Sequence, residues 1–250
     1  DAQLHLGAWQ SKDRYPEHVD LLMVSSQVAY GLGDKENAMK YALRALELAE
    51  NGSALDLPGF LALRDIFMSF DGTEDAYRIM SVGLQHFPTN LELLSSCAGI
   101  LFAQGKAEKS LDQTLAYMAV KAVSLPGGKP TFAPLHVRQL YIKNLEVLAE
   151  WDVALTERLE LLNISEKPAA LEVFDAARCA IQAGQPKKAL ELCQPLLDKN
   201  PEDDIALGLF GEAYCQSGEY VTAVEYLRKA VRINPAQPAL WLKLADACKL

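Results

Sequence analysis

The sequence has 250 residues, of which 33 are acidic and 24 are basic, so its formal net charge at pH 7 is −9 and its isoelectric point lies near 5.0. Half of the residues are hydrophobic and 23% are charged, a composition that supplies a core and excludes disordered and collagen-like chains. The acidic balance, without any lysine- or arginine-rich run, predicts that the chain does not bind nucleic acid. No stretch of 18 apolar residues occurs, so we expect no membrane insertion by this chain.

A period of 34 residues runs through the sequence, and internal repetition of this kind decides the fold class. Three pairs of landmark residues are each separated by 34 positions: Gly184 and Gly218, Ala189 and Ala223, and Pro201 and Pro235. Two turn-rich insertions, at residues 51–54 and 125–134, lengthen the period where they occur. The pattern therefore predicts an array of similar units.

In chain order, residues 1–18 are predicted to be the second helix of a truncated repeat. Three whole repeats follow over residues 19–124, and the insertion at 125–134 separates them from three more over residues 135–237. Residues 238–250 are predicted to be the first helix of another truncated repeat. The insertion is interpreted either as a spacer or as a lid. Because the chain begins at Asp1 and ends inside a helical pattern, we expect it to be a piece of a longer protein.

Each whole unit is predicted to form two amphipathic helices. In residues 204–237 the apolar residues recur at steps of three and four, which is helical periodicity: Leu207, Phe210, Tyr214, Val221, Val224, Leu227 and Val231. Gly218 can adopt the left-handed conformation that ends the first helix, and Pro235 stops the second. Ala223 is small enough to let the two helices approach closely.

At these positions the sequence resembles the tetratricopeptide repeat family. Unit 204–237 matches the family's pattern of large, small and proline positions at Leu207, Phe210, Gly211, Tyr214, Ala223, Leu227, Ala230 and Pro235. Unit 135–168 departs furthest, since Ile142 replaces the small residue at its eighth position. The resemblance implies an all-α fold, a right-handed superhelical solenoid of antiparallel helix pairs with six whole repeats and a half repeat at each end.

The resemblance further implies that the second, fifth, ninth and twelfth positions of each first helix face a concave groove. The candidate partner-binding residues are Met23, Gln27, Tyr30, Leu61, Asp65, Met68, Phe102, Gln139, Lys143, Phe174, Arg178 and Ile181. Methionine and aromatic side chains on such a face suit an apolar or amphipathic ligand. The alternative, left open here, is that some of these residues pack against neighbouring helices.

Two known uses of the fold are disfavoured by the groove positions. Cochaperones that grip acidic chaperone tails carry a clamp of lysine, arginine and asparagine, where this chain has Met23, Leu61 and Asp65. Sugar transferases carry an asparagine ladder, and this chain has Val24 and Ala62 at the first two of those positions. The groove is therefore not expected to hold a carboxylate tail.

No catalytic residues, metal ligands or cofactors are predicted. The five cysteines are never two residues apart, the four histidines form no HxxxH pair, and no glycine-rich phosphate loop occurs. The acidic run at residues 201–204 is predicted to cap a helix. Unpaired cysteines favour a reducing compartment, so we predict a cytoplasmic location, with the bacterial periplasm as the alternative.

The sequence thus predicts a non-catalytic scaffold that binds an apolar or amphipathic peptide or helix of a protein partner. The alternative is a recognition or regulatory region of a larger enzyme or export machine, such as a glycosyltransferase or a polysaccharide secretion protein. Self-association through the ends of the array is a further expectation, because each repeat leaves an apolar face for its neighbour.

Overall fold

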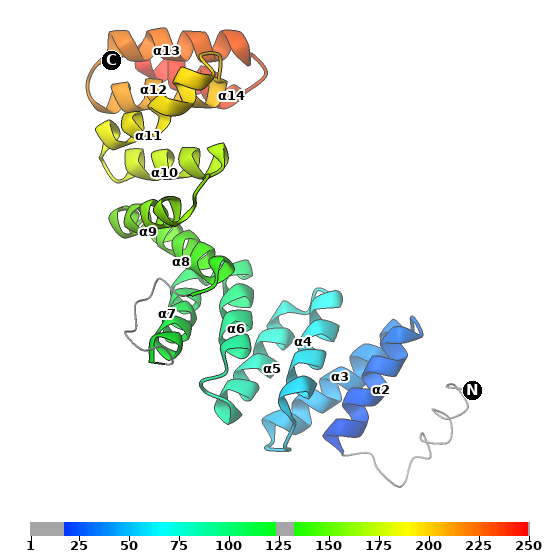
Figure 1. The fold of residues 1–250 in the computed structure, drawn as a ribbon. Helices are drawn as coiled ribbons and strands as arrows, with labels where there is room; N and C mark the ends of the chain where they lie inside the picture. The colour runs from blue at the N-terminus through cyan, green and yellow to red at the C-terminus, as the bar shows by residue number, and fades with distance from the viewer. Residues whose placement is uncertain (1–17, 124–132, 250) are drawn as a thin grey trace. The chain divides into compact units, whose positions relative to one another are not determined.

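The computed structural model describes residues 18–123 and 133–249 (Figure 1). All of the predicted half repeat at residues 1–18 except His18, and most of the predicted insertion, lie outside these ranges. The described residues form helices and no strands, which confirms the all-α prediction. The helices are α2 (Val19–Gly31), α3 (Lys35–Glu50), α4 (Leu57–Ser69), α5 (Thr73–His86), α6 (Leu91–Ala103), α7 (Ala107–Val123), α8 (Leu135–Val147), α9 (Trp151–Ile164), α10 (Ala170–Gln182), α11 (Pro186–Lys199), α12 (Asp204–Gln216), α13 (Tyr220–Ile233) and α14 (Pro238–Ala247).

The helices alternate between two roles. The even-numbered helices α2 to α14 are the first helices of the repeats, and the odd-numbered helices α3 to α13 are the second helices. Neighbouring first helices contact each other, as α2 does α4 and α10 does α12, and the second helices α3 and α5 also touch. Helices α2 to α5 therefore form two layers, with the first helices α2 and α4 on one side and the second helices α3 and α5 on the other.

The chain forms two compact units, residues 1–144 (unit 1) and 145–250 (unit 2). The division falls inside α8, whereas the sequence analysis treated the chain as one array interrupted at residues 125–134. In unit 1 a core cluster extends from Val19 to Ile100, through helices α2 to α6. In unit 2 one cluster joins α12, α13 and α14 around Leu207, Ala230 and Leu240.

The turns between paired helices depend on a left-handed residue. Gly218, between α12 and α13, has a φ of 81°, as predicted. Glycine adopts this conformation without the strain that a side chain would add. In two other turns the same conformation is taken by Asp71 and Ala149, at φ 58° and 60°. Aspartate tolerates this conformation, whereas alanine disfavours it, so Ala149 shows that the turn also forms at an unfavourable residue type.

Small residues lie at contacts between paired helices. Ala223 is fully buried. A Cβ atom added to Gly211 on α12 would come into severe conflict with the side chain of Leu227 on α13, including Cδ2 at 2.8 Å. In unit 1, Ser26 takes the place of a small apolar residue and donates its hydroxyl proton to the carbonyl oxygen of Ala38 at 2.6 Å. Small side chains therefore set the spacing within these pairs.

Helix capping follows the sequence prediction at residues 201–204. The Asp203 carboxylate accepts hydrogen bonds from the backbone N–H groups of Ile205 and Ala206, at 3.1 and 2.9 Å. Asn90 caps α6 in the same way. These side chains satisfy amides at the helix starts that have no partner within the helix.

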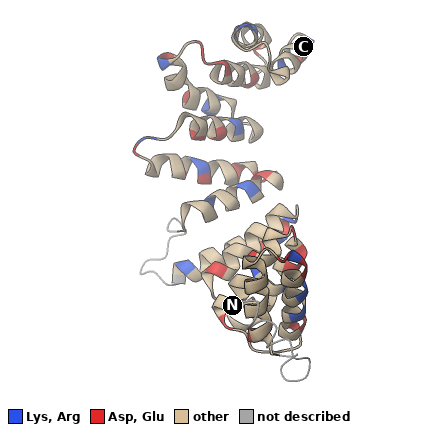
Figure 2. Ribbon diagram, turned by 90° about the vertical axis from the view of Figure 1, so that its right-hand side faces the viewer, with Lys and Arg blue, Asp and Glu red and all other residues tan. Residues whose placement is uncertain are grey.

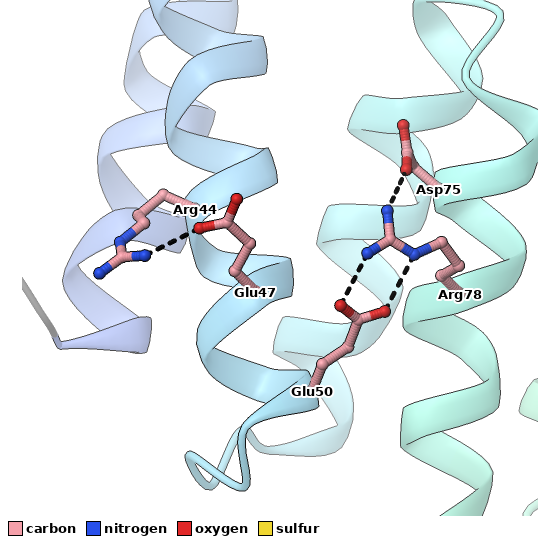
Figure 3. A network of polar contacts seen from close by, with 5 residues as sticks. All are labelled: Arg44, Glu47, Glu50, Asp75 and Arg78. Atoms are coloured by element: carbon pink, nitrogen blue, oxygen red, sulfur yellow. Dashed lines mark hydrogen bonds and ion pairs between the residues drawn. The ribbon is translucent and has the colours of Figure 1, made fainter.

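Ion pairs join successive second helices in unit 1. Arg78 on α5 donates to both carboxylate oxygens of Glu50 on α3, at 2.9 and 2.7 Å, and to Asp75 one turn earlier (Figure 3). These interactions raise the pKa of the Arg78 guanidinium. Elsewhere acidic and basic residues are interspersed along the helices of both units (Figure 2).

Candidate functional site

Unit 1 presents a row of large apolar side chains on its first helices. Tyr30, Met68 and Phe102 each occupy the twelfth position of a 13-residue helix, on α2, α4 and α6 respectively. Tyr30 is 48% exposed and Met68 is 41% exposed, while Phe102 is half-buried. We call these three residues the unit 1 row. Equal positions on neighbouring helices place the three side chains on the same face.

Aromatic packing fixes one end of the unit 1 row. The ring of Tyr30 meets the ring of Phe70, which follows α4, edge to face with centroids 5.8 Å apart. Sequence reasoning did not select Phe70, although its position two residues beyond Met68 was a usable signal. An edge-to-face contact of this kind restrains Tyr30 without covering it, so the ring remains available to a partner.

Two further predicted residues lie between the surface and the core. Met23 and Leu61 are half-buried and pack against the core cluster of unit 1. They occupy the fifth positions of α2 and α4, two turns before the unit 1 row. Their exposed portions extend the apolar surface toward the helix starts, and their buried portions contribute to stability.

Polar residues border this surface, and one pair is already engaged. Arg64 donates to Asp65 at 2.9 Å and to the Ser96 hydroxyl at 2.7 Å. Arg64 stands at the eighth position of its unit, where the family pattern has a small residue, and sequence reasoning missed it. Of the remaining predicted residues in unit 1, Gln27, Gln139 and Lys143 are exposed.

In unit 2, two predicted groove residues are buried instead. Phe174 and Ile181 on α10 are each only 4% exposed, so in this structure they are part of the interior and not of a surface open to a ligand. This corrects their placement. Arg178, the third predicted residue on α10, is exposed and donates to Asp175 at 3.1 Å.

A chain of ion pairs surrounds Asp175. Arg158 on α9 donates to Glu146 at 2.7 Å and lies 3.9 Å from the Asp175 carboxylate, which also binds Arg178. The side chains of Arg158 and Glu146 are largely buried. These charges pair with one another within unit 2, so a charged ligand would have to compete with these ion pairs for the two arginines.

The cysteines are free thiols, and three of the five are buried. Burial raises the pKa of Cys97 and of Cys193 to about 12 and that of Cys179 to about 11. A thiol with so high a pKa stays protonated at neutral pH and is a poor nucleophile. Among the residues that the structure describes, no three His, Cys, Asp or Glu side chains gather in a way that could hold a metal ion.

No helix in the described ranges combines the length and the apolar content that crossing a bilayer requires.

Two sequence profiles described as tetratricopeptide repeat match the chain, one over residues 174–238 and the other over residues 19–51. Cellulose synthase operon protein C of Escherichia coli K12 is 39% identical over 56 residues. That stretch is 22% of this chain and only 5% of the relative's length, so the likeness covers a small part of that protein.

Solved structures show the same fold at low sequence identity. YrrB, described as a TPR protein with an unusual peptide-binding site, superposes with a TM-score of 0.61 at 16% identity, over 78% of this chain and 93% of YrrB. A chain of the Naa15/Naa10 complex bound to HypK-THB gives 0.63 at 11% identity, over 94% of this chain and 34% of that one. MamA from Desulfovibrio magneticus RS-1 gives 0.56 at 15% identity, over 71% and 94%.

Proposed function

From the premise that this chain is a tetratricopeptide repeat protein, we propose that it is a non-catalytic scaffold. It binds an apolar or amphipathic peptide segment of a protein partner on the face that the first helices of unit 1 form. The observation that carries the proposal is the unit 1 row, Tyr30, Met68 and Phe102. Tyr30 and Met68 are exposed and Phe102 is half-buried, and their equal positions on successive first helices give an apolar strip suited to an apolar ligand.

The polar surroundings favour an apolar ligand over a charged one. Asp65 is paired with Arg64, and Arg64 also binds Ser96, so this cation is engaged within unit 1. A ligand carboxylate would have to displace these bonds to reach Arg64. An apolar side chain placed against Tyr30 and Met68 needs no such displacement and gains free energy by removing apolar area from water.

The likeness to YrrB supports a peptide as the ligand class, since that protein of the same fold is described as having a peptide-binding site. A sequence identity of 16% supports a shared fold but not shared binding residues, so the contacts proposed for this chain rest on its own unit 1 row.

A peptide selection tests the proposal. Peptides selected from a random library on the purified chain are expected to be rich in apolar residues. The double variant Tyr30→Ala, Met68→Ala should then bind them about tenfold more weakly or worse, as loss of central interface anchors does. Val221→Ala is the matched control, because Val221 is 80% exposed on α13 in the other unit. Equal affinity for the double variant and the control would refute the assignment.

The second candidate function is a recognition region within a larger export machine or enzyme, such as a polysaccharide secretion protein or a glycosyltransferase. The observation that favours it is the 39% identity to cellulose synthase operon protein C. The complete reading frame tests it: an adjoining catalytic or membrane domain is the expected result, and a frame made only of repeats would contradict it.

The two candidates differ in compartment. For the scaffold we propose a cytoplasmic location, which five free thiols suit, and for the export region a periplasmic one. Fractionation of the source cells with an antibody against the chain distinguishes them, since recovery in the periplasmic fraction would contradict the cytoplasmic proposal.

A further inference from the structure

A cationic surface lies on the outer side of α13 in unit 2. Arg228, Lys229 and Arg232 occupy the second half of this helix, and all three are exposed. Arg228 and Arg232 are four residues apart, so their side chains project from the same side of the helix. The buried residues Leu227 and Ala230 lie on the opposite side, where α13 packs against α12. We call Arg228 and Arg232 the arginine pair.

Neither member of the arginine pair has a hydrogen bond or an ion pair within the described part of the chain. Glu225, on the same side of α13, forms no ion pair with Arg228, and the Lys229 ammonium lies over the Tyr226 ring, 5.5 Å from its centre. The six other arginines in the described ranges each have an interaction partner: Arg44, Arg64, Arg78, Arg138, Arg158 and Arg178. The arginine pair therefore offers its N–H donors to an external ligand.

The arginine pair is particular to this repeat. Arg228 and Arg232 follow the small residue Ala223 by five and nine positions. The corresponding residues of the five preceding second helices include no cation: Leu43 and Glu47, Ser81 and Gln85, Leu115 and Ala119, Leu159 and Asn163, and Gln194 and Asp198. In α3, Leu43 and Glu47 are exposed although α5 packs beside that helix. These positions therefore face solvent within an array, and the fold does not require a cation there.

Helix stability does not explain the pair either. A cation in the last turn interacts favourably with the helix dipole, and this applies to Arg232. Arg228 precedes that turn, and α3 and α9 end without a basic residue in their last turns. Two like charges four residues apart on a helix repel each other. An anion bound between the two guanidinium groups would remove this repulsion.

We propose that the arginine pair binds an acidic segment of a partner protein, independently of the ligand of unit 1. Guanidinium groups match carboxylates with two parallel hydrogen bonds. Residues four apart on a helix have Cβ atoms about 5–6 Å from each other, and alternate residues of an extended chain are about 6.6 Å apart. An extended segment with an acidic residue at every second position therefore presents one carboxylate to each arginine.

The charge of the whole chain favours a short acidic segment over nucleic acid or an anionic membrane. The formal net charge is −9, and acidic and basic residues are interspersed along the helices (Figure 2). A long polyanion would meet these acidic residues as well as the arginine pair. A short segment meets mainly the pair, because charges more than about 8 Å away are largely screened at physiological ionic strength.

Two fluorescently labelled peptides provide the test, one of alternating aspartate and serine and one of alternating asparagine and serine. Fluorescence anisotropy at low ionic strength measures their binding to the parent chain and to the double variant Arg228→Gln, Arg232→Gln. The control is Lys35→Gln, Lys40→Gln, which removes two exposed cations from α3 and so changes the net charge equally. Circular dichroism establishes that both variants keep the helix content of the parent.

The parent and the lysine variant are expected to bind the aspartate peptide, and the arginine variant to bind it at least about tenfold more weakly. Added salt should weaken this binding. No binding of the aspartate peptide by the parent, equal binding of the two peptides, or equal losses in the two variants would each overturn the proposal.

Two further measurements separate this proposal from its alternatives. The variant Tyr30→Ala, Met68→Ala should bind the aspartate peptide as the parent does, and loss of binding there would place the peptide on unit 1 instead. The parent is also mixed with a DNA duplex and with phosphatidylserine vesicles. Binding of either one by the parent but not by the arginine variant, without binding of the peptide, would overturn the proposal because the occupant would be another polyanion.

Discussion

Glycine-to-alanine substitution at two comparable positions tests how closely α12 packs against α13. Gly211 and Gly99 both lie in the middle of first helices, on α12 and α6. Apart from adjoining residues and the backbone of its own helix, no atom lies within 4 Å of a Cβ added at Gly99, whereas at Gly211 that Cβ would conflict with Leu227, a fully buried side chain.

The two changes should have opposite signs. Alanine in a helix interior is more favourable than glycine by roughly 0.8–1 kcal/mol, so Gly99→Ala is expected to stabilise the chain by up to about that amount. Gly211→Ala gains the same propensity term. It also forces Leu227 to move within a packed core, and overpacking of this kind costs about 1–3 kcal/mol. The net expectation is therefore a loss of up to about 2 kcal/mol for Gly211→Ala.

Urea denaturation followed by circular dichroism measures both variants. Because repeat arrays can unfold in stages, hydrogen exchange of amides in α12 and α13 should accompany the midpoint comparison and localise the effect. A Gly211→Ala midpoint equal to or above that of Gly99→Ala would refute the close approach of α12 and α13.

Three further results are expected. Phe174→Ala should lower the free energy of unfolding by about 3–5 kcal/mol because the ring is buried, whereas Met68→Ala, at an exposed position, should change it by less than about 1 kcal/mol. Urea denaturation midpoints measure both variants, and similar losses would show that Phe174 is not in the interior. Arg78→Met should lower the free energy of unfolding by at most about 1 kcal/mol at low salt and by less in 1 M NaCl, because the ion pairs of Arg78 with Glu50 and Asp75 are partly exposed. A loss that does not shrink with added salt would argue against an ionic contribution. Burial raises the pKa of Cys97 to about 12 from an ordinary value of 9.0, so the unfolded chain loses this proton at a lower pH than the folded chain does. The free energy of unfolding should therefore fall as the pH rises from 9 toward 12, and it should fall less in Cys97→Ala. Identical dependence of the free energy of unfolding on pH in the two proteins would contradict a buried thiol.

The features that depend on local geometry can be predicted from the sequence. Gly218 ends α12 in the left-handed conformation and Asp203 caps the same helix, because both effects need only a few neighbouring residues. The 34-residue period then fixed the order of the helix pairs. Each amphipathic helix buries one face, and every repeat supplies an equivalent neighbouring helix for that face to pack against.

Exposure at a given repeat position, in contrast, depends on the packing of neighbouring repeats. Ile181 and Met68 both stand at the twelfth position of a first helix, yet one is buried and the other is exposed. Ala149 likewise adopts a left-handed turn conformation that its residue type disfavours. The physical reason is that burial and backbone strain depend on side chains brought in by neighbouring repeats, whose contacts a single helix period does not encode.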